Sequence, residues 1–226
     1  MCGRYTESKR TADVKARIAF DRAQMELMPR FNIAPTQMAP VVVVNDGEVV
    51  LKPMRWGLIP FWAKDESIGD RMINARAETV MEKPAFRTPF KRRRCLVVAD
   101  SFYEWQKLPN SKLKQPMRIL LKDEQPFGFA GLWDTWTSPD GSEVETFTII
   151  TGEPNELVAT IHNRMAVILP PEHHQQWLDP KFQDTEALTH LLVPYRVEEM
   201  KAHPVSTMVN NPKFEDSRCI GPIPNC

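Results

Sequence analysis

Residues 41–52, VVVVNDGEVVLK, decide the fold of this chain. Two apolar, β-branched runs, 41–45 and 48–52, flank Asp46-Gly47. Asp-Gly between such runs is typical of a two-residue type I′ turn, because both central residues must adopt positive φ. The stretch therefore predicts a β-hairpin.

The surrounding sequence favours more strands than helices. Asp140-Gly141 suggests a second turn between extended segments. Further strands are predicted at 95–99, 117–121, 127–132, 146–151 and 165–169. Helices are predicted at 11–28, 153–161, 171–178 and 185–192. Because strands and helices do not alternate as βαβ units, we expect an α+β fold with mainly antiparallel, barrel-like sheets and a few peripheral helices.

Length and composition indicate one soluble globular domain. The chain has 226 residues, of which 42% are hydrophobic and 26% charged. We expect the domain to cover residues 1–210 and the Pro-containing segment 211–226 to form a flexible tail. No apolar run approaches the roughly 18 residues that span a membrane, and no signal-peptide pattern is present. These features predict a cytoplasmic protein without a membrane partner.

Charge and cysteine content narrow the function classes. The net charge is zero, which disfavours a protein that coats polyanions. The basic run 91–94 (KRRR) is either a solvated face or a phosphate-contacting patch. Cysteines stand at positions 2, 95, 219 and 226 without a CxxC pair, so no metal site is predicted. No cofactor is expected either.

Cys2 is the residue with the most distinctive chemistry. Removal of Met1 would expose an α-amine and a thiol on adjacent carbons. The amine can condense with an aldehyde to an imine, and the thiol can then close a thiazolidine ring. An α-amine titrates at about 7.7–8.0 and a Cys thiol at about 8.5, so each is partly reactive near neutral pH. The alternative is that a cysteine stands at position 2 by chance and has no chemical role.

Three polar segments are candidates for a site. Residues 73–78 alternate small apolar residues with Asn74, Arg76 and Glu78, which fits a solvated edge strand or the wall of a site. Glu104 stands between two aromatics after an apolar strand. It is either an exposed side chain or a caged carboxyl with a raised pKa, suited to acid–base catalysis. His162, between a helix and a strand, is either an ordinary helix-end residue or a proton shuttle.

Taken together and in order, these segments resemble the SRAP family, the SOS-response-associated peptidases that process abasic sites. The resemblance covers the chain from Cys2 to about Ser206. The matching segments are 2–5 (CGRY), 31–35 (FNIAP), 55–60 (RWGLIP), 73–78 (INARAE), 95–105, 131–133 (GLW), 147–151, 161–165 (IHNRM) and 203–206 (HPVS). One departure is Ala166, where the family usually has Pro.

The resemblance implies a function and a set of site residues. Family members capture the open-chain aldehyde of an abasic site through the N-terminal Cys, as a thiazolidine DNA–protein crosslink. A lyase side activity and autoproteolytic removal of the residue before Cys2 are also implied. By motif, the catalytic residues would be Cys2, Asn74, Glu104 and His162. The DNA-binding residues would be Arg4, Trp62, Arg76, Thr151 and Arg164.

The implied partner is single-stranded DNA that contains abasic sites. Trp62, next to Pro60 and Phe61, could stack a base or block a pairing strand, and a core position is the alternative. We expect a monomer that is recruited to replication forks and associates with the nucleoid when bound to DNA.

Two other functions remain open at this stage. An N-terminal-nucleophile glutamine amidotransferase also begins Met-Cys-Gly, but usually has an aliphatic residue where this chain has Arg4. The second alternative is a non-covalent reader of modified or single-stranded DNA, whose DNA binding would persist after the loss of Cys2.

Overall fold

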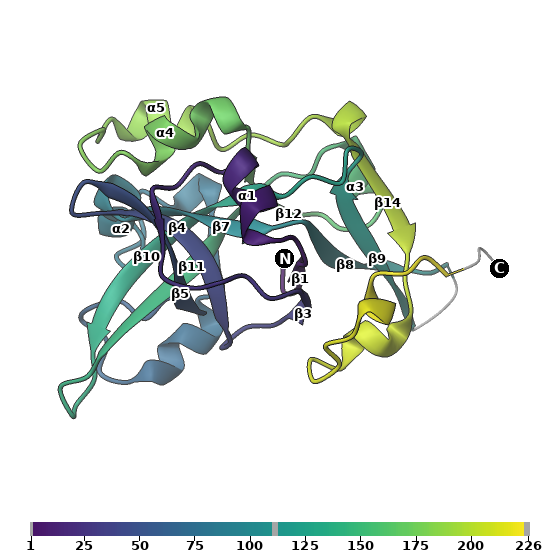
Figure 1. Ribbon diagram of the computed structural model, residues 1–226, viewed down its shortest axis with the longest axis horizontal. Helices are drawn as coiled ribbons and strands as arrows, with labels where there is room; N and C mark the ends of the chain where they lie inside the picture. The colour runs from purple at the N-terminus through teal and green to yellow at the C-terminus, as the bar shows by residue number, and fades with distance from the viewer. Residues whose placement is uncertain (1, 110–112, 224–226) are drawn as a thin grey trace.

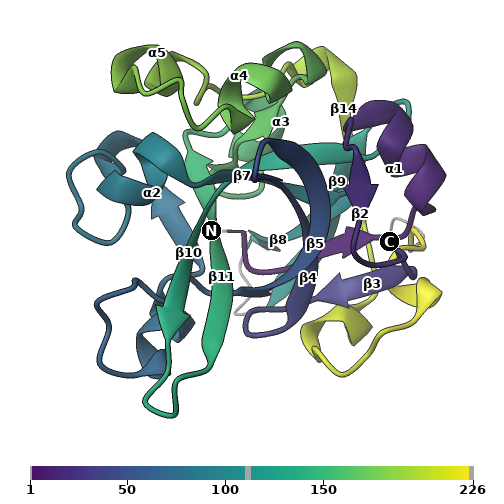
Figure 2. The same ribbon diagram turned by 60° about the vertical axis from the view of Figure 1, so that its left-hand side comes forward.

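A closed barrel of five strands forms the larger half of the molecule (Figure 2). The computed structural model describes residues 2–109 and 113–223. The barrel strands are β4 (Met38–Asn45), β5 (Glu48–Trp56), β7 (Arg94–Ala99), β10 (Phe127–Thr137) and β11 (Glu143–Gly152). Neighbours along this path are antiparallel, and β11 closes the ring by pairing in parallel with β5. The predicted barrel-like α+β fold is confirmed.

The hairpin of β4 and β5 has the predicted turn. Asn45 pairs with Glu48, which leaves Asp46 and Gly47 as the two turn residues. Their φ angles are 51° and 86°, as a type I′ turn requires. Val41, Val42 and Val43 of β4 are buried because both faces of this strand meet apolar side chains.

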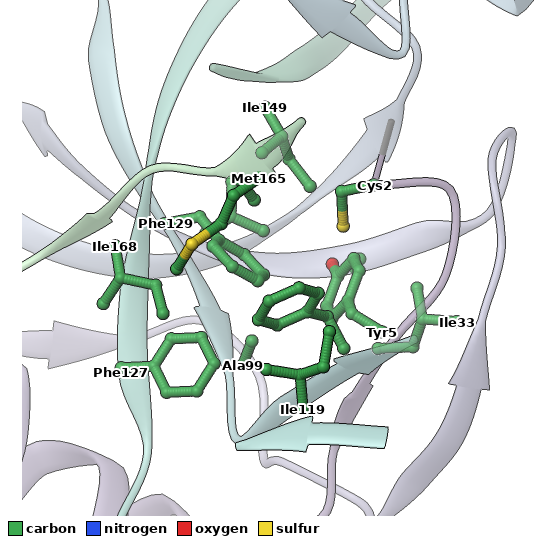
Figure 3. Packing of buried hydrophobic residues seen from close by; sticks show 14 of the residues in the cluster. Cys2, Tyr5, Ile33, Ala99, Ile119, Phe127, Phe129, Ile149, Met165 and Ile168 are labelled. Atoms are coloured by element: carbon green, nitrogen blue, oxygen red, sulfur yellow. The ribbon is translucent and has the colours of Figure 1, made fainter. Parts of the chain in front are cut away.

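A second, antiparallel sheet lies beside the barrel (Figure 1). Its strands, in spatial order, are β14 (Met200–Pro204), β9 (Lys114–Leu121), β8 (Ser101–Lys107), β1 (Tyr5–Glu7) and β3 (Arg30–Ile33). Side chains of both sheets share one apolar cluster, which includes Cys2, Tyr5, Phe129 and Ile149 (Figure 3). The N-terminal residues therefore lie between the two sheets.

Four short strands extend the barrel sheet. They are β2 (Arg22–Ala23), β6 (Asn74–Arg76), β12 (Met165–Ala166) and β13 (Ile168–Leu169). The single strand predicted at 165–169 is divided, because β12 pairs with β11 and β13 pairs with β10. Val167 joins them, with its N–H bonded to Ile150 and its carbonyl to Ala130. The segment thus passes from one barrel strand to the next.

The helices are short and peripheral (Figure 1). They are α1 (Thr11–Arg17), α2 (Arg87–Arg92), α3 (Glu156–Ala159), α4 (His174–Leu178) and α5 (Thr185–His190). The helix predicted at 11–28 is wrong beyond Arg17, because Ile18 is extended and β2 pairs with β5. Met28, the last residue of the predicted helix, is exposed. Within the described residues, none of the helices has the length and apolar character needed to cross a membrane.

Residues 205–223, here called the C-terminal strap, pack on the smaller sheet. Val205 pairs with Pro222, and the side-chain amide of Asn32 donates to the carbonyls of Val209, Asn211 and Phe214. Cys219, expected in a flexible tail, is buried. The described part of the expected tail at 211–226 is thus held against the domain; residues 224–226 lie outside the described residues.

Candidate active site

Cys2 lies at the seam between the barrel and the smaller sheet. Its side chain is fully buried in the shared cluster, where Figure 3 shows it beside Tyr5. The side-chain amide of Asn74 donates a hydrogen bond of 2.8 Å to the carbonyl of Cys2. On the other side, the Cys2 Sγ lies 4.0 Å from the carbonyl oxygen of Arg4. The residue is therefore held between β6 and β1; Met1, whose removal is expected, lies outside the described residues.

Glu104 reaches the same place from β8. Tyr5 of β1 pairs with Phe102, and the amide of Tyr103 donates to the carbonyl of Arg4 at 3.0 Å. Continuing this antiparallel register places Glu104 alongside the residues that directly follow Cys2. Glu104 also contributes to the electrostatic field at the Cys2 thiol. The nucleophile and the carboxyl are thus brought together by strand pairing.

Burial sets the chemistry of Glu104. The side chain is 2% exposed, and this burial raises its pKa to about 7. Tyr103 and Trp105 face the other way, into a small cluster with Val205 and Val209 of the C-terminal strap. The carboxyl is therefore enclosed between the two sheets rather than caged by its aromatic neighbours. A carboxyl with this pKa is present in both protonation states near neutral pH.

His162 stands on the loop between α3 and β12. Its Nδ1 lies 3.1 Å from the amide nitrogen of Arg164, from which it can accept a hydrogen bond, and 3.3 Å from the carbonyl oxygen of Arg164, to which it can donate one. Burial lowers the pKa of His162, so the ring is neutral near pH 7. The side-chain amide of Gln106, two residues beyond Glu104, donates to the carbonyl of Thr160 at 3.0 Å. This bond ties the His162 loop to β8.

The thiol of Cys2 is in an environment that disfavours the thiolate. Burial raises its pKa, and the Glu104 carboxylate raises it further. A thiol in such surroundings needs a proton acceptor or a hydrogen-bond donor before it can attack.

Two of the predicted DNA-binding arginines make internal contacts. Arg4 donates to the side-chain oxygen of Asn32 and to the carbonyl of Val209, both at 2.8 Å. Arg164 forms a two-bond ion pair with Glu78, at 2.6 and 2.9 Å, and donates to the carbonyl of Thr151. Thr151 itself is fully buried. These three residues support the structure around the site.

Arg76 and Trp62 instead border an open hollow next to Asn74. The hollow has a volume of about 310 Å³ and is mostly apolar. It is lined by Trp62, Met72, Asn74, Arg76, Thr79, Lys83, Pro84, Ala85 and Phe86. Trp62 is 48% exposed and the adjacent Phe61 is 61% exposed, whereas Trp56 is buried in the core. Exposed aromatics beside basic groups are typical of surfaces that bind single strands.

The basic run 91–94 is divided between two environments. Arg94 is buried and donates to five backbone carbonyls, those of Phe90, Lys91, Trp177, Asp179 and Phe182. Arg93 pairs with the buried carboxylate of Asp134. Only Lys91 and Arg92 are exposed, so the run is not a continuous phosphate-binding patch.

Comparison with known proteins agrees with this geometry. The family model described as SOS response associated peptidase (SRAP) matches residues 1–212. The chain belongs to the SRAP family. Among its relatives, "Abasic site processing protein YoqW" of Bacillus subtilis is 49% identical over 216 residues, which is 94% of this chain and 96% of that protein. The mouse "Abasic site processing protein HMCES" is 31% identical and is matched over 65% of its own length.

Solved structures show the same SRAP fold. A crystal structure of a protein from Bacteroides thetaiotaomicron superimposes with a TM-score of 0.87 at 30% identity. The match covers 98% of this chain and all of that chain. Ala166, where the family usually has Pro, lies in β12 and pairs with Thr151.

Some residues at the SRAP site were missed at the sequence level. Lys83 and Phe86 line the hollow, and Tyr5 lies next to Cys2 in the core. Lys83 and Phe86 gave no local signal, because they approach Arg76 only after the chain has turned through the short 3₁₀ helix Ala77–Thr79. Tyr5 follows Cys2-Gly3-Arg4 directly, and its apolar ring reads as an ordinary core residue.

Proposed function

We propose that this protein captures abasic sites in single-stranded DNA by forming a thiazolidine crosslink through Cys2. One observation carries the proposal: Cys2, Asn74 and a carboxyl with a pKa of about 7 meet at one point of the fold. The SRAP membership and the abasic-site processing named for its relatives support the same chemistry.

The proposed reaction needs no cofactor. Loss of Met1 frees the α-amine of Cys2. The amine adds to the aldehyde carbon of the open-chain sugar, and the resulting carbinolamine loses water to give an imine. The thiol then adds to the imine carbon. The C=N electron pair becomes a nitrogen lone pair that takes up the thiol proton, so one water molecule is released in all.

Each polar residue has a role that follows from its geometry. Glu104, half protonated near pH 7, donates a proton to the sugar ring oxygen during opening and to the departing hydroxyl during dehydration. His162, whose pKa is lowered by burial, holds the sugar oxygen and exchanges protons with it. The Asn74 amide holds the Cys2 carbonyl, and its buried Oδ1, without a partner among the described residues, accepts from the freed amine.

Single-strand preference follows from the hollow beside Asn74. Trp62 and Phe61 would stack on exposed bases and occupy the place of a pairing strand. Arg76 is the proposed phosphate contact among the three arginines, because it is exposed on β6. To contact a phosphate, Arg4 and Arg164 would first have to break their internal hydrogen bonds.

The same groups could act before and after capture. Glu104 and His162 would also assist hydrolysis of the peptide bond before Cys2, which would account for autoproteolysis. An imine at the sugar C1′ also makes the adjacent hydrogen acidic, so strand cleavage by β-elimination is a side reaction when ring closure is slow. Reversal of the ring would release the DNA.

The proposal is tested by incubating the protein with single-stranded oligonucleotides that either contain or lack one abasic site. The processed protein should form a denaturation-resistant adduct with the abasic strand only, and Cys2→Ala should form none without borohydride. A Cys2→Ala variant that gives the same stable adduct would refute the proposal. Binding without any adduct would favour a non-covalent reader, and glutamine hydrolysis would favour an amidotransferase.

A further inference from the structure

The hydroxyl of Tyr5 is a buried polar group that has no role in the reaction steps proposed above. Tyr5 is fully buried, with its ring edge-on to Trp56 at 5.2 Å and to Phe129 at 6.0 Å between centroids. Its hydroxyl has no hydrogen-bond partner among the described residues. A buried hydroxyl without a partner lowers stability, whereas Phe would fill the same space without that cost. The position therefore suggests a hydrogen bond that the hydroxyl makes only during the reaction.

The atom that the hydroxyl approaches is the Cys2 sulfur. In Figure 3 the Tyr5 oxygen points toward the Cys2 side chain, and both residues belong to the same cluster. Burial raises the pKa of Tyr5, and a negative charge on Cys2 raises it further. The phenol therefore stays protonated and can both donate and accept a hydrogen bond.

The remaining surroundings offer the sulfur little polar support. Ile149, Met165 and Phe129 form the apolar part of the cluster around Cys2 and Tyr5 (Figure 3). The charged and titratable groups that act on this pair are Glu104 on Cys2, and Arg30, Glu7 and Cys95 on Tyr5. Glu104 is already assigned to the sugar oxygens, and its charge opposes thiolate formation.

We infer that Tyr5 is a further catalytic residue, whose hydroxyl hydrogen-bonds the Cys2 sulfur and directs it to the imine carbon during ring closure. This role rests on the proposed crosslinking function. The hydroxyl accepts from the S–H before attack. It donates to the sulfur while the proton moves to the imine nitrogen and the S–C bond forms. The phenol keeps its own proton, so the overall balance of the reaction does not change.

This role separates two steps that other site residues affect together. Imine formation uses the α-amine and should not depend on the Tyr5 hydroxyl. Ring closure uses the sulfur, so its rate should depend on the Tyr5 hydroxyl. A purely structural role for Tyr5 would not divide the two steps in this way.

The test compares Tyr5→Phe with Tyr195→Phe, a control whose hydroxyl donates to Glu199 at 3.0 Å and lies outside the site. Processed proteins are mixed with an abasic single strand and quenched with borohydride at successive times. Mass spectrometry separates the reduced imine from the thiazolidine, which is lighter by two hydrogens. We expect Tyr5→Phe to form the imine at the wild-type rate and to close the ring at least about tenfold more slowly, the effect of losing one hydrogen bond to a charged group. The urea midpoint of unfolding should be equal or higher.

Equal closure rates in Tyr5→Phe and wild type would overturn the inference and leave the proposed function intact. A parallel loss of imine formation, ring closure and stability would also overturn it, since that pattern marks a structural residue. If wild type itself forms no adduct, the proposed function fails first and the inference fails with it.

Discussion

The side-chain amide of Asn74 donates a 2.8 Å hydrogen bond to the backbone carbonyl of Cys2. Asn74 begins β6, which pairs in parallel with β11 of the barrel. The bond therefore fixes the N-terminal residues relative to a rigid element. Without it, the freed amine of Cys2 could swing away from Glu104.

Asn74→Ala should consequently slow abasic-site capture by about tenfold or more, the effect of losing one buried hydrogen bond that positions a reactive group. Both imine formation and ring closure should slow, because the whole residue loses its support. Asn45→Ala, in the hairpin turn, is the matched control and should react normally. Single-turnover crosslinking on a gel measures the effect, and a normal rate in Asn74→Ala would show that the bond is dispensable.

Glu104→Gln should slow capture by about 10²–10⁴-fold, the usual contribution of a general acid or base. In wild type, the rate should rise with pH as the α-amine loses its proton at about 7.7–8.0. It should be limited at higher pH by loss of the Glu104 proton, whose pKa is about 7. In Glu104→Gln, the rate should still rise with pH but should no longer be limited at higher pH.

The rate–pH profile of both proteins checks this prediction, with the exposed Glu143→Gln as control. Binding to intact single-stranded DNA should be unchanged in Glu104→Gln. A parallel loss of binding would instead identify Glu104 as a residue that positions the DNA.

Arg76→Ala and Trp62→Ala should weaken DNA binding in distinguishable ways. Loss of a phosphate contact should make the log–log salt dependence shallower by about 0.7. Trp62→Ala should keep the slope, weaken binding by about 1–3 kcal/mol and narrow the preference for single strands, because stacking releases no counterions. Binding to single-stranded and duplex strands with a non-reactive abasic analogue over a salt series provides the measurement. If Trp62→Ala keeps the wild-type preference for single strands over duplex, Trp62 does not explain that preference.

Glu7 should make the fold less stable at alkaline pH. Burial raises its pKa from 4.5 to about 8, and the nearby Asp100 adds to the shift. Between these values the folded state holds a proton that the unfolded state has lost, so the free energy of unfolding falls by about 1.4 kcal/mol per pH unit on account of this group. Glu7→Gln should remove that dependence, so its stability relative to wild type should improve from pH 5 to pH 8.

Urea unfolding of Glu7→Gln and wild type across this pH range measures the difference, with the exposed Glu26→Gln as control. A constant difference between Glu7→Gln and wild type at all pH values would mean that the Glu7 carboxyl titrates normally in the folded protein.

The strands were predictable where local sequence and tertiary pairing agree. The 41–52 hairpin satisfies strand propensity and turn chemistry together, and its turn has the predicted φ angles. The helix predicted at 11–28 is wrong beyond Arg17, because the same spacing of apolar residues also occurs in the irregular segment that follows. Val14, Ile18 and Leu27 are all buried, but Leu27 reaches the core after a short strand beside β5. The apolar spacing thus identified Val14 and Ile18 as buried, but it did not reveal the change from helix to extended backbone after Arg17, beyond which Met28 is exposed.

The sequence named candidate site residues that lie close together in the structure, but it did not predict most of their contacts. Cys2, Asn74 and Glu104 were found by chemistry and motif, and they lie together. Arg4 is predicted to bind DNA, and its internal hydrogen bonds could not be foreseen from sequence, because its partners Asn32 and Val209 are remote in the chain and converge only when the C-terminal strap packs on the smaller sheet. The burial of Glu104 likewise depends on the contact between two sheets.

The most direct test of covalent capture is the intact mass of the protein after incubation with a single-stranded abasic oligonucleotide, without reductant. We expect one adduct on the Met1-free protein, equal in mass to protein plus DNA minus one water, with Cys2 as the modified residue. A protein that retains Met1 should show no adduct. A stable adduct on uncleaved protein, or one mapped to a residue other than Cys2, would refute capture through the processed N-terminus.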